Sequence, residues 1–165
     1  MRKMARLLVF ILALCLFSVT VPLAAEEKVP APDFKLPDLK GNSVALSGYK
    51  GKQPVLLFFW TTRCPLCVKA LKVLKQKQPD LSAVGLEVLC LDIGESEDRV
   101  MRFMQKNSLT CRVLLDTDAG VAYSYEVIGV PTYILVDKQG NIVFTDFSFP
   151  FDDYKELLSE FSLNK

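Results

Sequence analysis

The feature that most constrains the fold is a run of six apolar residues that leads directly into a pair of cysteines. The run covers residues 55–60 and reads Val-Leu-Leu-Phe-Phe-Trp. A short uninterrupted apolar run is typical of a strand buried on both faces of a parallel sheet. Cys64 and Cys67 follow after a short connection, and residues 68–78 then place apolar side chains at helical spacing. The sequence therefore predicts a buried strand, a tight turn and a helix whose first turn carries both cysteines.

Strands and helices alternate along the rest of the chain. The other predicted elements are a hairpin of residues 33–36 and 43–46, strands over 86–93 and 112–115, a helix starting at Ser96, a helical turn over 119–125, a hairpin of residues 133–136 and 141–144, and a final helix from Asp152 that presents Leu157, Leu158 and Phe161 inward. Pro79 is expected to end the helix that follows the cysteines. This order predicts an α/β fold with a central mixed sheet flanked by helices.

The first 25 residues differ from the rest of the chain. Three basic residues precede an apolar run over residues 7–23, and Ala24 and Ala25 stand before the acidic Glu26. This pattern is typical of a secretory signal, although the run is also close to the length of a membrane span. We therefore expect residues 1–25 to be a signal peptide or an N-terminal membrane anchor, and residues 26–165 to form one domain. Both alternatives place the domain in the periplasm or another extracytoplasmic compartment, either soluble after cleavage or anchored.

Charge and composition exclude several kinds of function. The chain has 20 basic and 19 acidic residues, and the basic N-terminal segment leaves the remaining residues with a slight excess of acids. Such a balance favours no nucleic-acid partner. The chain contains no histidine, which excludes His-ligated metals and catalytic arrangements that pair serine or cysteine with histidine.

The position of Cys64 at the start of a helix predicts a reactive thiol. Unpaired backbone N–H groups and the helix dipole stabilise an anion there, and the thiolate is the reactive form of cysteine. Pro65 suits the first helical position because its missing N–H costs nothing there. Cys67 lies one turn further and should be a buried resolving thiol. We predict a redox-active Cys64–Cys67 disulfide with no metal and no other cofactor.

The cysteine pair is also compatible with two simpler roles. It could be half of a zinc site, but no second Cys-x-x-Cys motif is present. It could also be an inert structural disulfide, although so small a loop restrains little of the unfolded chain. Cys90 lies in a predicted strand and Cys111 begins the next one, so a bridge between them stays an open alternative to two free thiols.

Several motifs resemble known proteins. The pattern Trp60-x-x-x-Cys64-Pro65-x-Cys67, together with Gly-Val-Pro-Thr at residues 129–132, resembles thioredoxin. The segments Ala-Pro-Asp-Phe at residues 31–34 and Leu-Ser-Gly-Tyr-Lys-Gly-Lys at residues 46–52 resemble the TlpA/ResA branch of that superfamily, as does the segment over residues 94–118. The resemblance covers residues 29–163 and implies a thioredoxin-like fold with an N-terminal hairpin and an inserted strand–helix segment.

The resemblance also implies a function. Relatives of this kind are membrane-associated or periplasmic reductants of disulfides, often in cytochrome c maturation. The implied partners are exported proteins that contain disulfides or thiols, and a membrane thiol that donates electrons. The resemblance further implies a cis peptide bond between Val130 and Pro131, packed against the cysteines. The residues expected to contact the substrate are Trp60, Pro65, Leu66, Val130 and Pro131.

Two positions depart from the family pattern. Thioredoxins carry a buried acid six residues before the first cysteine, where this chain has Phe58, and ResA-like proteins carry an acid three residues after the second cysteine, where it has Ala70. Neither proton acceptor for the resolving thiol is therefore present. Glu87, in the next predicted strand, is the substitute that the sequence suggests, although an exposed carboxylate is the simpler interpretation.

Two rival functions follow from the same fold. Peroxiredoxins place a threonine three residues before the reactive cysteine, as Thr61 is here, but their proline four residues earlier is replaced by Leu57. A non-catalytic module that binds an exported polypeptide near Trp60, Pro65 and Val130 is the second rival.

Overall fold

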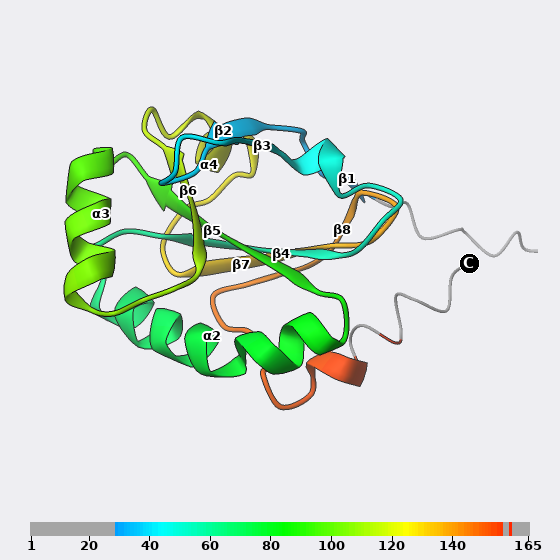
Figure 1. The fold of residues 1–165 in the computed structure, drawn as a ribbon. Coiled ribbons are helices and arrows are strands. Elements are labelled where there is room, and N and C mark those ends of the chain that lie inside the picture. Colours follow the sequence, from blue (N-terminus) through cyan, green and yellow to red (C-terminus); the bar gives the residue numbers. More distant parts are fainter. Residues whose placement is uncertain (1–28, 157–158, 160–165) are drawn as a thin grey trace, which may run out of the picture.

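The computed structural model describes residues 29–156 and 159, and its core is a six-stranded sheet (Figure 1). The strand order across this sheet is β1-β8-β7-β4-β5-β6. The strands are β1 (Val29–Pro30), β8 (Asn141–Asp146), β7 (Thr132–Val136), β4 (Val55–Trp60), β5 (Glu87–Ile93) and β6 (Arg112–Asp116). The predicted apolar strand is thus a central one, and every residue of β4 is buried.

The sheet is mixed, as predicted. Strands β4, β5 and β6 run parallel, with Trp60 opposite Asp92 and Asp92 opposite Leu115. Strand β7 is antiparallel to both β4 and β8. Because parallel neighbours end at the same edge of a sheet, the residues that follow β4 and β5 lie near one another.

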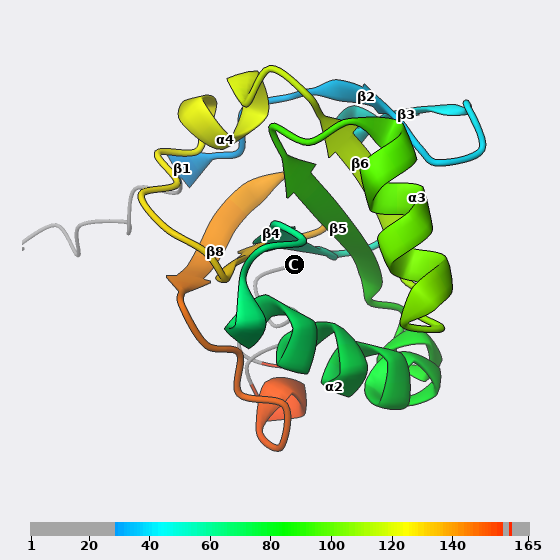
Figure 2. The same cartoon turned by 90° about the vertical axis from the view of Figure 1, so that its left-hand side faces the viewer.

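Two layers cover the faces of the sheet (Figures 1 and 2). One face carries the helices α2 (Pro65–Ala83) and α3 (Glu97–Lys106), and the other carries the helix α4 (Gly120–Ser124) and a hairpin of β2 (Lys35–Pro37) and β3 (Ser43–Ala45). A short 3₁₀ helix, η1 (Leu46–Gly48), follows the hairpin. Alternate residues of β4 point to opposite layers: Phe58 and Trp60 pack under α2, whereas Leu57 and Phe59 pack under the hairpin and α4. The predicted hairpin and mixed sheet are confirmed.

Two elements differ from the predictions. The helix after the cysteines continues through Pro79 to Ala83, so the predicted end at Pro79 is wrong. Leu81 is completely buried in the core, and its burial holds the last turn in place despite the unfavourable proline. Residues 29–30, where the sequence predicted no strand, form the edge strand β1, paired with β8.

Some of the predicted features at the two ends of the chain lie outside the described residues. The expected signal peptide or anchor of residues 1–25 lies outside the described residues, as do Leu157, Leu158 and Phe161 of the predicted final helix, of which residues 154–156 are helical. Within the described part, no helix combines the length and the apolar content that a membrane span requires.

Candidate active site

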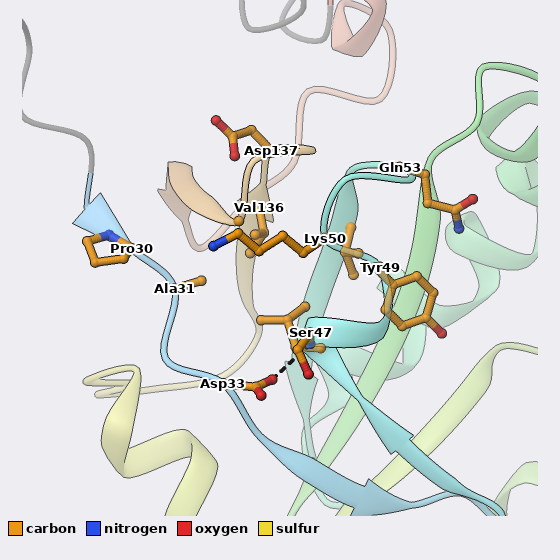
Figure 3. Close-up of a pocket in the computed structure, with 12 residues that line it drawn as sticks. Pro30, Ala31, Asp33, Ser47, Tyr49, Lys50, Gln53, Val136 and Asp137 are labelled. Carbon is orange, nitrogen blue, oxygen red and sulfur yellow. Dashed lines mark hydrogen bonds between the residues drawn. The ribbon is translucent and has the colours of Figure 1, made fainter.

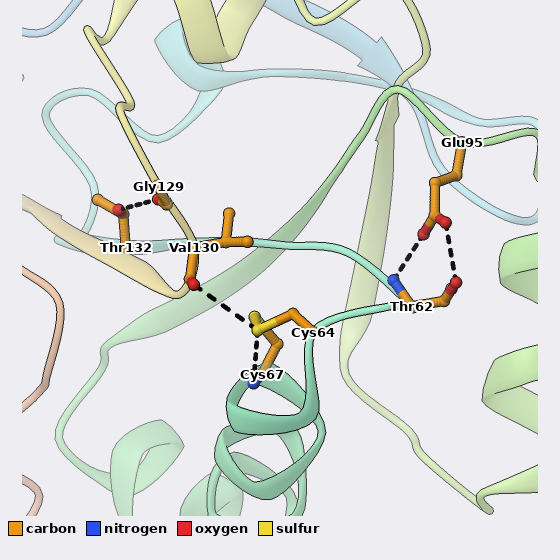
Figure 4. The surroundings of a disulfide bond; sticks show 7 residues. All are labelled: Thr62, Cys64, Cys67, Glu95, Gly129, Val130 and Thr132. Atoms are coloured by element: carbon orange, nitrogen blue, oxygen red, sulfur yellow. Dashed lines mark hydrogen bonds between the residues drawn. A yellow bond between two sulfur atoms is a disulfide. The ribbon is translucent and has the colours of Figure 1, made fainter.

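The two cysteines lie where β4 turns into α2 (Figure 4). Pro65 is the first residue of α2 and Cys64 is its N-cap. Cys64 and Cys67 form a disulfide, with 5.2 Å between their Cα atoms. The backbone N–H of Cys67 donates a hydrogen bond to Cys64 Sγ over 3.1 Å. The sulfur of Cys64 therefore takes the place that a serine or aspartate oxygen takes at an ordinary helix N-cap.

This position has an electrostatic consequence. The helix that starts here has 19 residues, and its first N–H groups have no partners within the helix. A sulfur that already accepts one of these N–H groups would accept it more strongly as an anion. When the disulfide is reduced, the structure thus favours the thiolate at Cys64.

A loop from the opposite side of the sheet meets the cysteines. The peptide bond between Val130 and Pro131 is cis, as the resemblance implied. The carbonyl oxygen of Val130 lies 3.6 Å from Cys64 Sγ, and Figure 4 shows this carbonyl directed toward the disulfide. The Thr132 hydroxyl donates to the Gly129 carbonyl over 2.6 Å and braces the loop.

Exposure separates the two cysteines. Cys64 is half-buried, whereas Cys67 is completely buried, as predicted. Pro65 is exposed, and the Leu66 side chain is 62% exposed between the cysteines. A partner can therefore approach Cys64 but not Cys67, which fits an attacking thiol and a resolving thiol.

The predicted contact residues do not all lie at the surface. Pro65, Leu66, Val130 and Pro131 are exposed or half-buried around Cys64. Trp60 was also predicted to contact the substrate, but it is completely buried, and its ring packs against Phe103 at 5.7 Å between ring centroids. The structure therefore corrects this assignment and makes Trp60 part of the support beneath the site.

The structure also corrects the suggested proton acceptor. Phe58 is completely buried against Tyr133, and Ala70 is packed against the same core, so neither family position offers an acid. Glu87 pairs with Val55, the first residue of β4, whereas Trp60 is the last residue of that strand. Glu87 interacts there with Gln53 and Arg112. That end of the strand lies roughly 16 Å from the cysteine end, given the rise per residue of a β-strand. Glu87 is therefore too far away to accept a proton from Cys67.

Two acids that the sequence analysis missed lie at the correct end of the sheet. Asp92 is completely buried near the end of β5, and Glu95 is 5% exposed in the loop that follows. Glu95 accepts hydrogen bonds from the Thr62 backbone N–H at 2.6 Å and the Thr62 hydroxyl at 2.8 Å (Figure 4). It also forms ion pairs with Arg99 at 2.8 Å and Arg63 at 3.6 Å. A charged residue directly after the apolar residues 88–91 of a predicted strand was the available signal for Asp92.

The two carboxyl groups have opposite acidities. Burial, and then the neighbouring carboxyl group of Glu95, raise the pKa of Asp92 to about 8. Burial also acts to raise the pKa of Glu95, but the hydrogen bonds from Thr62 and Asp92 and the charge of Arg99 outweigh it and hold this pKa below its usual value. At neutral pH, Asp92 is therefore a neutral acid and Glu95 an anion.

Outside the cysteine site, the described chain has a pocket near β1 and two further cysteines. A pocket of about 150 Å³ lies near β1, η1 and the start of β4 (Figure 3), and none of the predicted site residues lines it. There Asp33 accepts a hydrogen bond from the Ser47 backbone N–H over 2.8 Å. Cys90 and Cys111 are free thiols. Among the described residues, no group of three or more His, Cys, Asp or Glu side chains could hold a metal ion.

Comparison with known proteins agrees with this geometry. The AhpC/TSA family model matches residues 28–145. The chain is 37% identical to the thiol-disulfide oxidoreductase ResA of Geobacillus kaustophilus (strain HTA426), over 68% of this chain and 64% of the relative. It is 34% identical to that of Bacillus subtilis (strain 168), over 83% of this chain and 78% of the relative.

A solved structure extends the comparison to the fold. The thioredoxin domain of a thiol-disulfide oxidoreductase from Bacteroides vulgatus superposes with a TM-score of 0.69 at 28% identity, over 81% of this chain and 96% of that domain. The predicted thioredoxin-like fold is thereby confirmed. The chain spans 64% of the length of its Geobacillus relative, so the similarity concerns this domain. From the matched family model and these relatives, we conclude that the chain belongs to the AhpC/TSA family and, within the thioredoxin superfamily, to its ResA-like members.

Proposed function

We propose that the chain is an extracytoplasmic thiol–disulfide oxidoreductase that reduces disulfides in exported proteins through Cys64 and Cys67. The observation that carries this proposal is the disulfide at the N-terminus of α2, in which one sulfur is accessible and the other is buried. The relatives named thiol-disulfide oxidoreductase support the same activity.

The exchange reaction follows from the unequal exposure of the two sulfurs. The Cys64 thiolate attacks one sulfur of a substrate disulfide, so that a mixed disulfide forms and the other substrate sulfur leaves as a thiolate. Cys67, as a thiolate, then attacks Cys64 Sγ, the mixed disulfide breaks, and the second substrate sulfur leaves. Two electrons pass to the substrate, and the protons of the two protein thiols end on the substrate sulfurs. A membrane thiol donor would return the Cys64–Cys67 disulfide to two thiols.

The surroundings of Cys64 suit an extended polypeptide segment. Besides Leu66, the large apolar side chains of Ile128 and Phe147 are 90% and 56% exposed, and Phe147 lies next to Gly129 in the loop before the cis-proline. Exposed apolar groups in and beside the loop that contacts a reactive sulfur favour a protein substrate over a small ion. We assign Pro65, Leu66, Val130 and Pro131 to this binding surface.

The compartment of the protein and the direction of electron flow belong to the proposal as well. The basic and apolar residues 1–25 support export, with or without retention as an anchor. The resemblance to ResA-like proteins supports a reductant, with the haem-attachment cysteines of exported cytochromes c as a candidate substrate. A redox titration of the Cys64–Cys67 couple tests the direction: a potential below that of the glutathione pool supports a reductant, and one near the strong oxidants would reverse the assignment.

Covalent trapping tests the roles of the two cysteines. In Cys67→Ser the mixed disulfide cannot be resolved, so partners should accumulate on Cys64 and appear as reducible adducts on non-reducing gels. In the matched variant Cys64→Ser the buried Cys67 should trap none. Equal trapping by the two variants would contradict the assignment of attacking and resolving thiols.

The same preparations separate the rival functions. Leu57 is completely buried in β4, at the position where a peroxiredoxin would carry its proline, so we expect no rapid consumption of hydrogen peroxide by the reduced protein. A non-catalytic binding module would keep its cellular activity in Cys64→Ser, whereas an oxidoreductase would lose it.

A further inference from the structure

Two buried polar groups lie beneath the cysteine site: the indole N–H of Trp60, which has no hydrogen-bond partner among the described residues, and the carboxyl group of Asp92, which interacts with Glu95. They belong to residues that face each other in the register of β4 and β5. Asp92 is two residues after Cys90, so its side chain lies on the sheet face that packs against α2, the face to which Trp60 and Cys67 also belong. A buried carboxylate beside a second carboxylate is costly, whereas a carboxylic acid that donates to that second carboxylate is much less so.

The surroundings of Asp92 indicate where its proton is held. The charged groups that act on it are Glu95, in the loop after β5, and Arg99, on α3. Its register partners are Trp60 on β4 and Leu115 on β6, neither of which carries a charge. Glu95 is already an anion held by Thr62 and Arg99, so a proton on Asp92 gives the two carboxyl groups together one negative charge in place of two.

This pair is connected to the reactive cysteine. Thr62, whose backbone N–H and hydroxyl both donate to Glu95, lies two residues before Cys64. Two residues of chain span at most about 7 Å. The carboxylate of Glu95 therefore fixes the short segment that leads into Cys64, so a change of charge on the pair acts on the segment that positions the sulfur.

We propose that Asp92 is a positioning residue of the cysteine site, which together with Glu95 holds one proton at neutral pH and whose ionisation makes the Cys64 sulfur more basic. This inference rests on the proposed function, because it concerns the reactivity of the same sulfur. It assigns an acid to a site in which Phe58 and Ala70 occupy the two family acid positions.

Direct titration tests the first half of the proposal without reference to catalysis. In the oxidised full chain, labelled with ¹³C at aspartate carboxyl groups, one resonance should titrate near pH 8 and should be absent from the spectrum of Asp92→Asn. If the resonance lost in Asp92→Asn titrates near pH 4 in the wild-type chain, the shared proton does not exist. This outcome leaves the disulfide-exchange function intact, so the two proposals can fail separately.

The pH dependence of Cys64 alkylation tests the second half. The rate of Cys64 alkylation is measured in the reduced full chain of wild type and of Asp92→Asn. The ratio of the wild-type rate to the variant rate should rise about threefold from about pH 6 to about pH 9. The reason is that a second nearby charge raises the basicity and hence the nucleophilicity of the thiolate. Asp98→Asn, which removes an exposed carboxylate on α3, is the matched control and should give a constant ratio. A constant ratio for Asp92→Asn would contradict the proposal, because a purely structural effect changes the rate equally at every pH.

Discussion

At the scale of single residues, Asp92 shows how burial changes the chemistry of an ordinary side chain. A solvent-exposed aspartate is ionised at neutral pH, but Asp92 has no exposed surface and lies beside the anion of Glu95. Its side chain differs from that of Asn only in the proton-bearing oxygen. Asp92→Asn is therefore an isosteric substitution that removes the ionisable group and keeps the shape of the side chain.

The raised pKa of Asp92 predicts how the stability of the fold depends on pH. The folded chain holds this proton up to about pH 8, whereas the unfolded chain releases it near pH 3.8. Between these values the folded state binds more protons, so the free energy of unfolding should fall as pH rises. Asp92→Asn should remove this dependence of the free energy of unfolding on pH. Above pH 8 the variant should be more stable than wild type by at least about 1 kcal/mol.

Urea denaturation of the oxidised chain at a series of pH values measures this effect. Asp98→Asn provides the control, because its carboxylate is 81% exposed and its removal should leave this pH dependence as it is. A wild-type stability that does not change between pH 5 and pH 8, with the same behaviour in Asp92→Asn, would contradict a buried neutral acid.

At the scale of secondary-structure elements, α2 joins the chemistry to the core. Its first turn carries the disulfide, and its buried side chains Leu71, Leu74 and Leu81 fix its orientation on the sheet. The helix keeps this register even though Pro79 removes one of its N–H groups. Packing of the apolar face thus outweighs a local residue that disfavours the helix.

The cost of Pro79 leads to a second prediction. Pro79 is exposed, so Pro79→Ala loses little packing, restores an N–H group that can bond to the Lys75 carbonyl and should stabilise the chain by about 2 kcal/mol. Thermal unfolding of the oxidised protein is the measurement, and Gln76→Ala, at another exposed position of α2, should change stability little. A decrease in stability for Pro79→Ala would show that the proline does not cost what helix geometry implies.

The sequence predicted the elements that have a strong local signal. The apolar run of β4, the helix after Cys64 and the hairpin around residues 137–140 were all found. Strand β1 was missed because two residues, one of them Pro30, have no periodicity, and the end of α2 was misplaced because Leu81 lies beyond a proline. Burial decided the remaining differences: the sequence did not show that Trp60 points inward, or that Asp92 and Glu95 meet at the end of β5.

At the scale of the whole molecule, the sheet separates the four cysteines of the described residues into two groups. Cys64 and Cys67 lie at the edge where β4 and β5 end, whereas Cys90 is completely buried within β5 and Cys111 precedes β6. Cys90 is opposite Val113, which places Cys111 two residues out of register on the neighbouring strand. With this offset the two side chains are still neighbours on one face of the sheet, where both are free thiols.

Counting thiols in the intact protein checks this arrangement. When the chain is purified without reductant and alkylated in denaturant, mass spectrometry should find the label on Cys90 and Cys111 and not on Cys64 or Cys67. Reduction before alkylation should add the label to the second pair. Absence of the label from Cys90 and Cys111 before reduction would reveal a second disulfide and contradict the structure.

The central claim is that the N-terminus of α2 makes Cys64 an anion, and the most direct test is its alkylation rate. In the reduced chain, Cys64 should react at about pH 6 at least about threefold faster than a cysteine in an unstructured peptide, because a larger ionised fraction outweighs the lower nucleophilicity of a weaker base. Peptide mapping distinguishes Cys64 from the other thiols. If Cys64 reacts no faster than the peptide thiol, the helix does not activate it and the proposed enzyme has no nucleophile.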